Sequence, residues 1–146
     1  MASEIIPHLW LGNILDARNS EFMNKIDIVI NCSKNIPFYS KTTRNIRIAV
    51  NDDLAKIEIA NMYKYLDNAT QFIYDNILKN KVIFVHCYAG KQRSATVICA
   101  YLMRYLHISY KEATELMRTK RYVVFTPLSN FDNALKLFET KINKTL

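Results

Sequence analysis

The chain has 146 residues, the length of one domain, and half of them are hydrophobic, as in an ordinary globular protein. Lys and Arg outnumber Asp and Glu by 20 to 13. The resulting charge of +7 favours anionic partners such as phosphopeptides, nucleic acid or acidic lipid, although a bias in composition would explain it equally well. No apolar run is long enough to span a bilayer, and the first ten residues lack the pattern of a secretion signal.

The cysteine content points to a reducing compartment. There are three cysteines, an odd number, and their spacing fits neither a disulfide framework nor a zinc site. No repeat or linker divides the chain. We therefore expect one domain over residues 1–146, cytoplasmic and without metal or membrane attachment; the sequence specifies no oligomeric state.

Strands alternate with a helix in the first part of the chain. Apolar runs predict strands at IDIVI (26–30), IRIAV (46–50) and VIFV (82–85). Between the last two strands, one face of a predicted helix carries these side chains: Ile59, Met62, Tyr63, Leu66, Ala69, Thr70, Ile73 and Ile77. This alternation predicts an α/β fold with a central, largely parallel sheet.

The second part of the chain predicts helices alone. An apolar helix is expected over ATVICAYLMRYL (95–106), and Ser109 with Glu112 has the spacing of a capping box before KEATELMRTK (111–120). Pro127 suits the first turn of a last helix that runs through LFET (137–140). Since ligands of such sheets bind beyond the carboxyl ends of the strands, the segment after VIFV is the first place to look for a site.

That segment, HCYAGKQRS (86–94), contains Gly90, one of only two glycines in the chain. A tight loop between a strand and a helix points backbone N–H groups inward, and the helix dipole adds to their attraction for an anion. Glycine lets the loop close because positive φ costs it nothing. Backbone amides of residues 88–93 (Tyr88, Ala89, Gly90, Lys91, Gln92 and Arg93) are therefore predicted to cradle a phosphate, with the planar fork of the Arg93 side chain beside them.

Cys87 is the predicted nucleophile of this loop. The loop amides, the helix dipole and Arg93 all stabilise a thiolate, so we expect the pKa of Cys87 below the ~8.5 of a free thiol. A thiolate at the floor of a phosphate cradle is placed to attack phosphorus and form a phosphocysteine. Ser94 is expected to donate a hydrogen bond to the sulfur as it leaves, and His86 to orient the loop rather than act as a base.

After these observations, a family resemblance is plain. HCYAGKQRSAT resembles the HCxxGxxR(S/T) signature of the cysteine-dependent protein tyrosine phosphatases, and among them the small dual-specificity phosphatases, including those of large DNA viruses. The likeness extends over IIPHLWLGN, INCSKN, IRIAVNDD, RSATVICAYLM and RYVVFTPLSNF. It implies a four- to five-stranded sheet flanked by helices. It also implies phosphomonoester hydrolysis without metal or cofactor, acting on phosphorylated proteins or peptides.

A general acid must protonate the leaving oxygen, and an Asp at a neighbouring strand end fits this task. Asp52 and Asp53 both follow IRIAVN directly. The resemblance favours Asp52, and Asp53 or a mere turn-forming role for the pair remain the alternatives.

The substrate class follows from what the chain lacks. It contains nothing similar to the Trp-Pro-Asp loop or the aromatic recognition loop of the longer tyrosine-only enzymes, so the resemblance favours a shallow pocket that also admits phosphoserine and phosphothreonine. Lys91 also occurs at this position in phosphoinositide phosphatases of the superfamily, but Tyr88 stands where those enzymes carry a second basic residue. Ala89 stands where RNA-directed relatives carry a His, which disfavours nucleic acid. A silent phosphate-binding module is the remaining alternative.

The other cysteines have simpler interpretations. Cys99 falls on the apolar helix after the loop and is expected in the core. Cys32 ends a predicted strand, where it is either a core residue or a partner that forms a reversible disulfide with Cys87 under oxidation.

Overall fold

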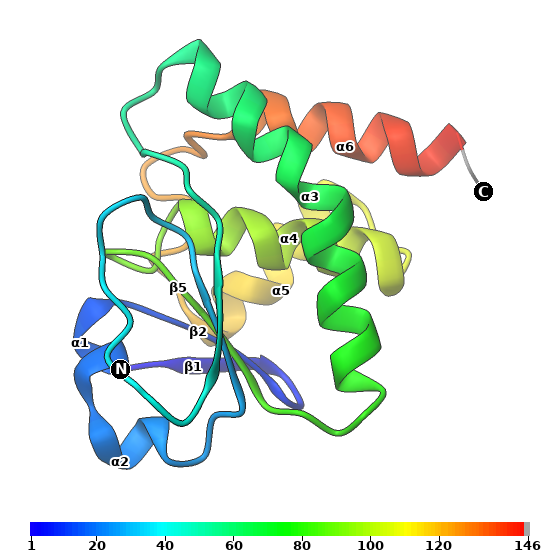
Figure 1. Ribbon diagram of the computed structural model, residues 1–146. Coiled ribbons are helices and arrows are strands. Elements are labelled where there is room, and N and C mark those ends of the chain that lie inside the picture. The colour runs from blue at the N-terminus through cyan, green and yellow to red at the C-terminus, as the bar shows by residue number, and fades with distance from the viewer. Residues whose placement is uncertain (145–146) are drawn as a thin grey trace.

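The structure, a computed structural model, describes residues 1–144 (Figure 1). Its elements in chain order are the following: β1 (Ser3–Ile6), β2 (Leu9–Gly12), α1 (Ile14–Arg18), α2 (Ser20–Met23), β3 (Ile28–Asn31), β4 (Arg44–Arg47), α3 (Lys56–Ile77), β5 (Ile83–His86), α4 (Arg93–Tyr105), α5 (Tyr110–Lys120) and α6 (Asp132–Lys144). After β5 the described chain contains helices only, as expected. No helix within residues 1–144 is long and apolar enough to cross a membrane.

The five strands form one sheet in the order β1-β2-β5-β3-β4. β1 pairs with β2 in antiparallel fashion, and the other three pairs are parallel. The expected mostly parallel sheet is therefore confirmed, with its three predicted strands displaced by one to three residues. The sequence analysis did not predict β1 and β2, because Pro7 interrupts this segment and neither half shows a clear alternation.

The two faces of the sheet are covered unequally. Ile83 and Val85 of β5 belong to the large core with α3 to α6, whereas Phe84 points to the other face and joins a small cluster with Val29 and Ala17. Figure 1 shows α3 to α6 on one side of the sheet and the short α1 and α2 on the other. This division follows from the two-residue repeat of a strand, which turns successive side chains to opposite faces.

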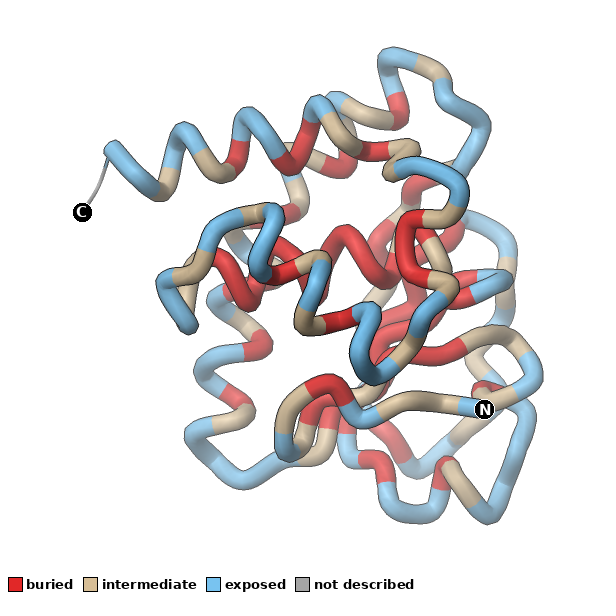
Figure 2. Tube along the Cα trace, turned by 180° about the vertical axis from the view of Figure 1, so that it is seen from behind, coloured by how far each residue is buried: buried red, intermediate tan, exposed pale blue. Residues whose placement is uncertain are grey.

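Helix α4 is the centre of the larger layer. It contacts α3, α5 and α6 as well as β5, and every residue from Ser94 to Met103 is buried. In Figure 2 the central strands and α4 are almost continuously red, while α6 alternates between buried and exposed turns. The loop that precedes α4 is consequently fixed at both ends, by a central strand before it and a core helix after it.

The helix features predicted from the sequence are present in the structure, except for the start of the last helix. Ser109 and Glu112 form the expected capping box at the start of α5, and α3 buries the predicted face through Met62, Leu66 and Ile73. Pro127, however, lies outside any helix: it follows a cis peptide bond, and α6 begins only at Asp132. The expectation that Pro127 opens the last helix was wrong, because polar contacts described below hold this segment in a turn.

Candidate active site

The loop between β5 and α4 curls so tightly that only glycine fits at its centre. Gly90 has φ of 67°, in the left-handed region, and a Cβ added there would lie 2.5 Å from the carbonyl oxygen of Gly12. The conformation and the close approach both exclude a side chain. The rare glycine is therefore required where the loop passes the end of β2.

Cys87 lies at the floor of this loop and is 3% exposed. Its Sγ is 3.1 Å from Ser94 Oγ and accepts a hydrogen bond of 3.3 Å from the Gly90 N–H. Burial alone would raise the pKa of the thiol, but the hydrogen bonds from Ser94, the charge of Arg93 and the Gly90 N–H outweigh it and lower the pKa. The environment favours a thiolate.

Arg93, the first residue of α4, faces the same space. Its Nη1 donates to the Val50 carbonyl oxygen at 3.1 Å, while its Nε is buried and has no partner within residues 1–144. A buried guanidinium N–H without a partner is costly unless an anion binds it. The thiol and Arg93 share the wall of one cavity of about 490 Å³.

The structure separates the two candidate acids. Asp52 lies in the cavity wall with Cys87, and its Oδ1 accepts a hydrogen bond of 2.8 Å from Asn130 Nδ2. Asp53 instead accepts from the backbone N–H of Ala55 at 3.0 Å, as in a turn, and is not part of the wall. Asp52 is therefore the carboxyl group within the site.

Gln92 has a role that the sequence analysis did not predict. Its amide nitrogen donates to the carbonyl oxygens of Leu128 (2.8 Å) and Thr126 (3.4 Å), and its Oε1 accepts from the Asn130 N–H at 2.9 Å. These bonds hold the turn that contains Pro127. They also place Asn130, the partner of Asp52, at the cavity.

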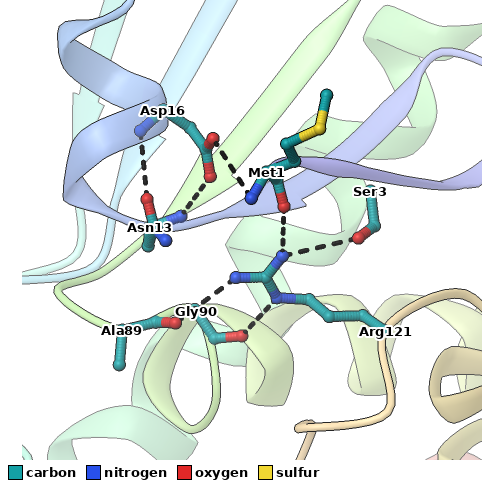
Figure 3. Close-up of polar contacts among 7 residues, drawn as sticks. All are labelled: Met1, Ser3, Asn13, Asp16, Ala89, Gly90 and Arg121. Carbon is teal, nitrogen blue, oxygen red and sulfur yellow. Dashed lines mark hydrogen bonds and ion pairs between the residues drawn. The ribbon is translucent and has the colours of Figure 1, made fainter.

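Arg121 braces the loop from behind. Its Nε donates to the Gly90 carbonyl oxygen at 2.9 Å and its Nη2 to that of Ala89 at 3.4 Å (Figure 3). Since the C=O and N–H of one peptide point in opposite directions, holding the Ala89 carbonyl outward helps turn the Gly90 N–H toward the Cys87 sulfur. The same guanidinium donates to the Met1 carbonyl oxygen and to Ser3 Oγ. The only signal in the sequence was the resemblance of RYVVFTPLSNF to a family segment, which assigned Arg121 no role.

His86 is not part of the cavity wall and lies beside Phe84. Its ring stacks on Phe84 with 5.3 Å between centroids, and Nδ1 is 3.2 Å from the Cys87 carbonyl oxygen. Burial lowers the pKa of His86 to about 4, so the ring is neutral at neutral pH. A neutral ring directed at the loop backbone suits an orienting role.

The remaining loop residues surround the opening of the cavity. Tyr88 and Ala89 are exposed and Lys91 is half-buried, and all three contribute to its wall. The Tyr88 carbonyl oxygen accepts from the Ile14 N–H at 3.0 Å, which joins the loop to the start of α1. Of residues 88–93, all but Gly90 contribute to the cavity wall.

Both other cysteines are buried. Cys99 lies on α4 in the core, where burial raises the pKa of its thiol. Cys32 extends β3 beside the loop, because its N–H donates to the His86 carbonyl oxygen at 2.7 Å. Burial raises the pKa of Cys32 strongly, and the nearby Cys87 raises it further.

Comparisons with known proteins show the family of the chain. The sequence matches the profile of the family described as "Dual specificity phosphatase, catalytic domain" over residues 9–141. It is 35% identical over 144 residues to "Putative tyrosine phosphatase 123R" of Invertebrate iridescent virus 6, covering 98% of this chain and 95% of the viral protein.

Two further similarities concern a longer relative and the fold. The chain is 31% identical to human dual specificity protein phosphatase 9, covering 95% of this chain but only 36% of that protein. In fold it resembles human DUSP28, with a TM-score of 0.86, 24% identity and coverage of 97% of this chain and 95% of that one. The expected resemblance, fold class and enzyme class are confirmed: with a family match over nearly its whole length and a viral relative of the same extent, the chain belongs to the dual-specificity phosphatases.

Proposed function

We propose that the chain is one catalytic domain that hydrolyses phosphotyrosine and phosphoserine or phosphothreonine in proteins through a phosphocysteine intermediate. The observation that carries the proposal is one cavity lined by Cys87, whose thiol pKa is lowered, by Asp52 and by Arg93, whose Nε has no partner among residues 1–144. Nucleophile, anion site and acid are the three parts that this chemistry needs.

In the first step, the Cys87 thiolate attacks phosphorus and an S–P bond forms while the P–O bond to the substrate breaks. Arg93 and the N–H groups of the loop hold the phosphoryl oxygens, as preorganised donors do where charge is spread over a transition state. The departing oxygen takes a proton from the carboxyl group of Asp52, so that an alcohol or a phenol leaves.

In the second step, water releases the phosphate. The Asp52 carboxylate takes a proton from the water, whose oxygen attacks phosphorus as the S–P bond breaks. Ser94 Oγ, 3.1 Å from the sulfur, stabilises the departing thiolate by donating a hydrogen bond. The products are inorganic phosphate and the resting thiolate.

Phosphorylated proteins or peptides are the proposed substrates, and a reducing, cytoplasmic compartment is the proposed location. The relatives named as protein phosphatases support the choice of substrates. The choice of compartment follows from the chemistry, because a thiolate nucleophile is active only while it is reduced. No metal or cofactor takes part in the proposed steps.

The test is phosphate release, at neutral pH and without added metal, from a peptide that carries both phosphothreonine and phosphotyrosine. We expect the wild type to release phosphate from both residues and Cys87→Ser to release none. Asp52→Asn should be slower by about 10²-fold or more, because general acids contribute this much. Binding of the peptide without release by the wild type would overturn the proposal in favour of a silent phosphate-binding module.

A further inference from the structure

The peptide unit that joins Val50 to Asn51 is held on both of its polar edges. Arg93 Nη1 donates to its carbonyl oxygen at 3.1 Å. On the other edge, the N–H of Asn51 donates to Glu58 Oε2 at 2.9 Å. Since Asp52 is the next residue, this one peptide connects the phosphate-binding arginine to the start of the acid-bearing segment.

Glu58 is a buried carboxylate, and both of its oxygens accept hydrogen bonds. It is 3% exposed. Oε2 is 2.8 Å from the Lys34 ammonium, and Oε1 accepts from Asn61 Nδ2 at 3.2 Å. The hydrogen bond from Lys34, first of all, lowers the pKa of Glu58 and keeps it charged. Lys34 lies in the segment after β3, so the pair links the segment after β3 to helix α3.

The geometry differs from ordinary helix capping. Glu58 is the third residue of α3, from which a capping-box carboxylate would reach back to the N–H of Ala55, the N-cap. That N–H is occupied by Asp53 Oδ1 at 3.0 Å. The Glu58 side chain bonds to Asn51 instead, seven residues back in the chain. Its two shortest contacts thus lie outside its own helix, one to Lys34 and one to the segment that precedes Asp52.

We propose that Glu58, held by Lys34, is a positioning residue for the general acid: it fixes the Val50–Asn51 peptide so that the Asp52 side chain meets the leaving oxygen. The inference rests on the proposed role of Asp52. Glu58 touches no substrate and acts only through this peptide.

Substrates with different leaving groups separate positioning from mere structure. The tyrosine side chain of a phosphotyrosine peptide must be protonated as it leaves. The leaving group of an aryl phosphate made from a strongly acidic phenol departs as a phenolate and needs no proton. We expect Glu58→Gln and Lys34→Met to lower kcat/KM on the peptide by about tenfold or more, since misplacement of a reacting group by about 1 Å costs up to 10²-fold. On the activated aryl phosphate kcat/KM should stay within about twofold of wild type, because it includes only the steps up to formation of the phosphocysteine, in which that leaving group needs no acid.

Three further variants complete the experiment. Lys34→Arg keeps the positive charge and should restore most of the loss on the peptide. Asp67→Asn, on the exposed face of α3 and paired with Lys141, is the matched control and should leave both substrates unaffected. Asp52→Asn gives the difference between the two substrates that is expected when the acid is lost completely. Thermal unfolding of each variant shows that it is folded, and the partly exposed Lys34 offers a second route if Glu58→Gln does not fold.

The outcomes distinguish the two proposals. Equal losses on both substrates for Glu58→Gln and Lys34→Met would make the pair structural and overturn the inference. The inference also fails if neither variant changes turnover of the peptide while Asp52→Asn does. If Asp52→Asn lowers kcat/KM equally on the peptide and on the activated aryl phosphate, Asp52 is not the general acid. The positioning role of Glu58 is then wrong as well.

Discussion

The two segments that meet in the cavity are held in different ways. Residues 87–93 run between a central strand and a core helix, and Arg121 and Gln92 fix them through backbone carbonyls and the neighbouring turn. Residues 51–54 are mostly exposed, and among residues 1–144 only single side chains from elsewhere hold them: Asn130 on Asp52 and Glu58 on the N–H of Asn51.

The difference corresponds to what each segment must do in the proposed reaction. A phosphate cradle works by preorganised donors, so rigidity before binding reduces the cost of reaching the transition state. A general acid must reach a leaving group that differs among substrates, which a lightly held segment permits. Damage to the loop should therefore abolish all turnover, and damage to the acid segment should affect demanding leaving groups first.

Gly90→Ala should have the largest effect on the rigid segment. The new Cβ would meet the Gly12 carbonyl oxygen at 2.5 Å in a backbone conformation unsuited to it, so the loop must shift. We expect kcat/KM to fall by about 10²-fold or more on every substrate, since about 1 Å of misplacement suffices. Stability should decrease by about 1–3 kcal/mol, to be measured by chemical unfolding. Normal turnover of a well-folded variant would show that the loop is less rigid than its contacts indicate.

Ser94→Ala should have the next largest effect. Ser94 lowers the pKa of Cys87, so its loss must raise that pKa, and the rate of Cys87 alkylation should reach its plateau at higher pH than in the wild type. Turnover should fall by about tenfold because the second step loses a hydrogen bond to the departing sulfur, and bonds to charged groups contribute about 1.5–3 kcal/mol. Iodoacetamide labelling across a pH series measures the shift. An unchanged alkylation profile would contradict the assigned cause.

Asn130→Ala tests the lightly held segment. Without the 2.8 Å hydrogen bond from Asn130, Asp52 has no side-chain partner within the described residues, and kcat/KM for a phosphotyrosine peptide should fall by about three- to tenfold. The kcat/KM for activated aryl phosphates should be unaffected, because it includes only the steps up to formation of the phosphocysteine, in which their leaving group needs no acid. Asn133→Ala, the same change on the exposed face of α6, is the control. A loss on both substrate types would show that Asn130 supports the loop through Gln92 rather than the acid.

Cys32→Ser should have the smallest effect on activity and a clear one under oxidation. If peroxide converts the Cys87 thiolate to a sulfenic acid, the Cys32 thiol can attack it, forming a disulfide and releasing water. We expect wild-type activity to return on reduction with dithiothreitol, and Cys32→Ser to recover less because its sulfenic acid is oxidised further. Mass spectrometry of peroxide-treated protein should detect the disulfide. Equal recovery of both proteins would leave Cys32 as a core residue only.

The sequence analysis was successful where structure depends on neighbours in the chain. The buried strand before the loop, Gly90 within it and the apolar helix after it are contiguous, so one motif predicted the loop conformation and the meeting of Cys87 with Arg93. The capping box at Ser109 is local in the same sense.

The contacts that could not be predicted join distant segments. Asn130 and Asp52 are 78 residues apart, and Arg121 and Gly90 are 31 apart. For Gln92 the sequence predicted only a backbone contact with phosphate. Nothing in the sequence indicated that its side-chain amide binds the turn around Pro127. That turn also explains the error at Pro127: a proline suits a first helical turn locally, but three hydrogen bonds to Gln92 hold this segment in another conformation.

The contacts of Arg121 with Met1 and Ser3 limit how far the domain can be truncated at its N-terminus. The family profile begins to match at residue 9, which would suggest residues 9–146 as a sufficient unit for expression. Such a fragment would lack β1, expose the edge of β2, and deprive Arg121 of two acceptors beside the Ala89 and Gly90 carbonyls that it holds. We expect the trimmed protein to keep its helical content while losing turnover, because the first three residues support the catalytic loop from behind.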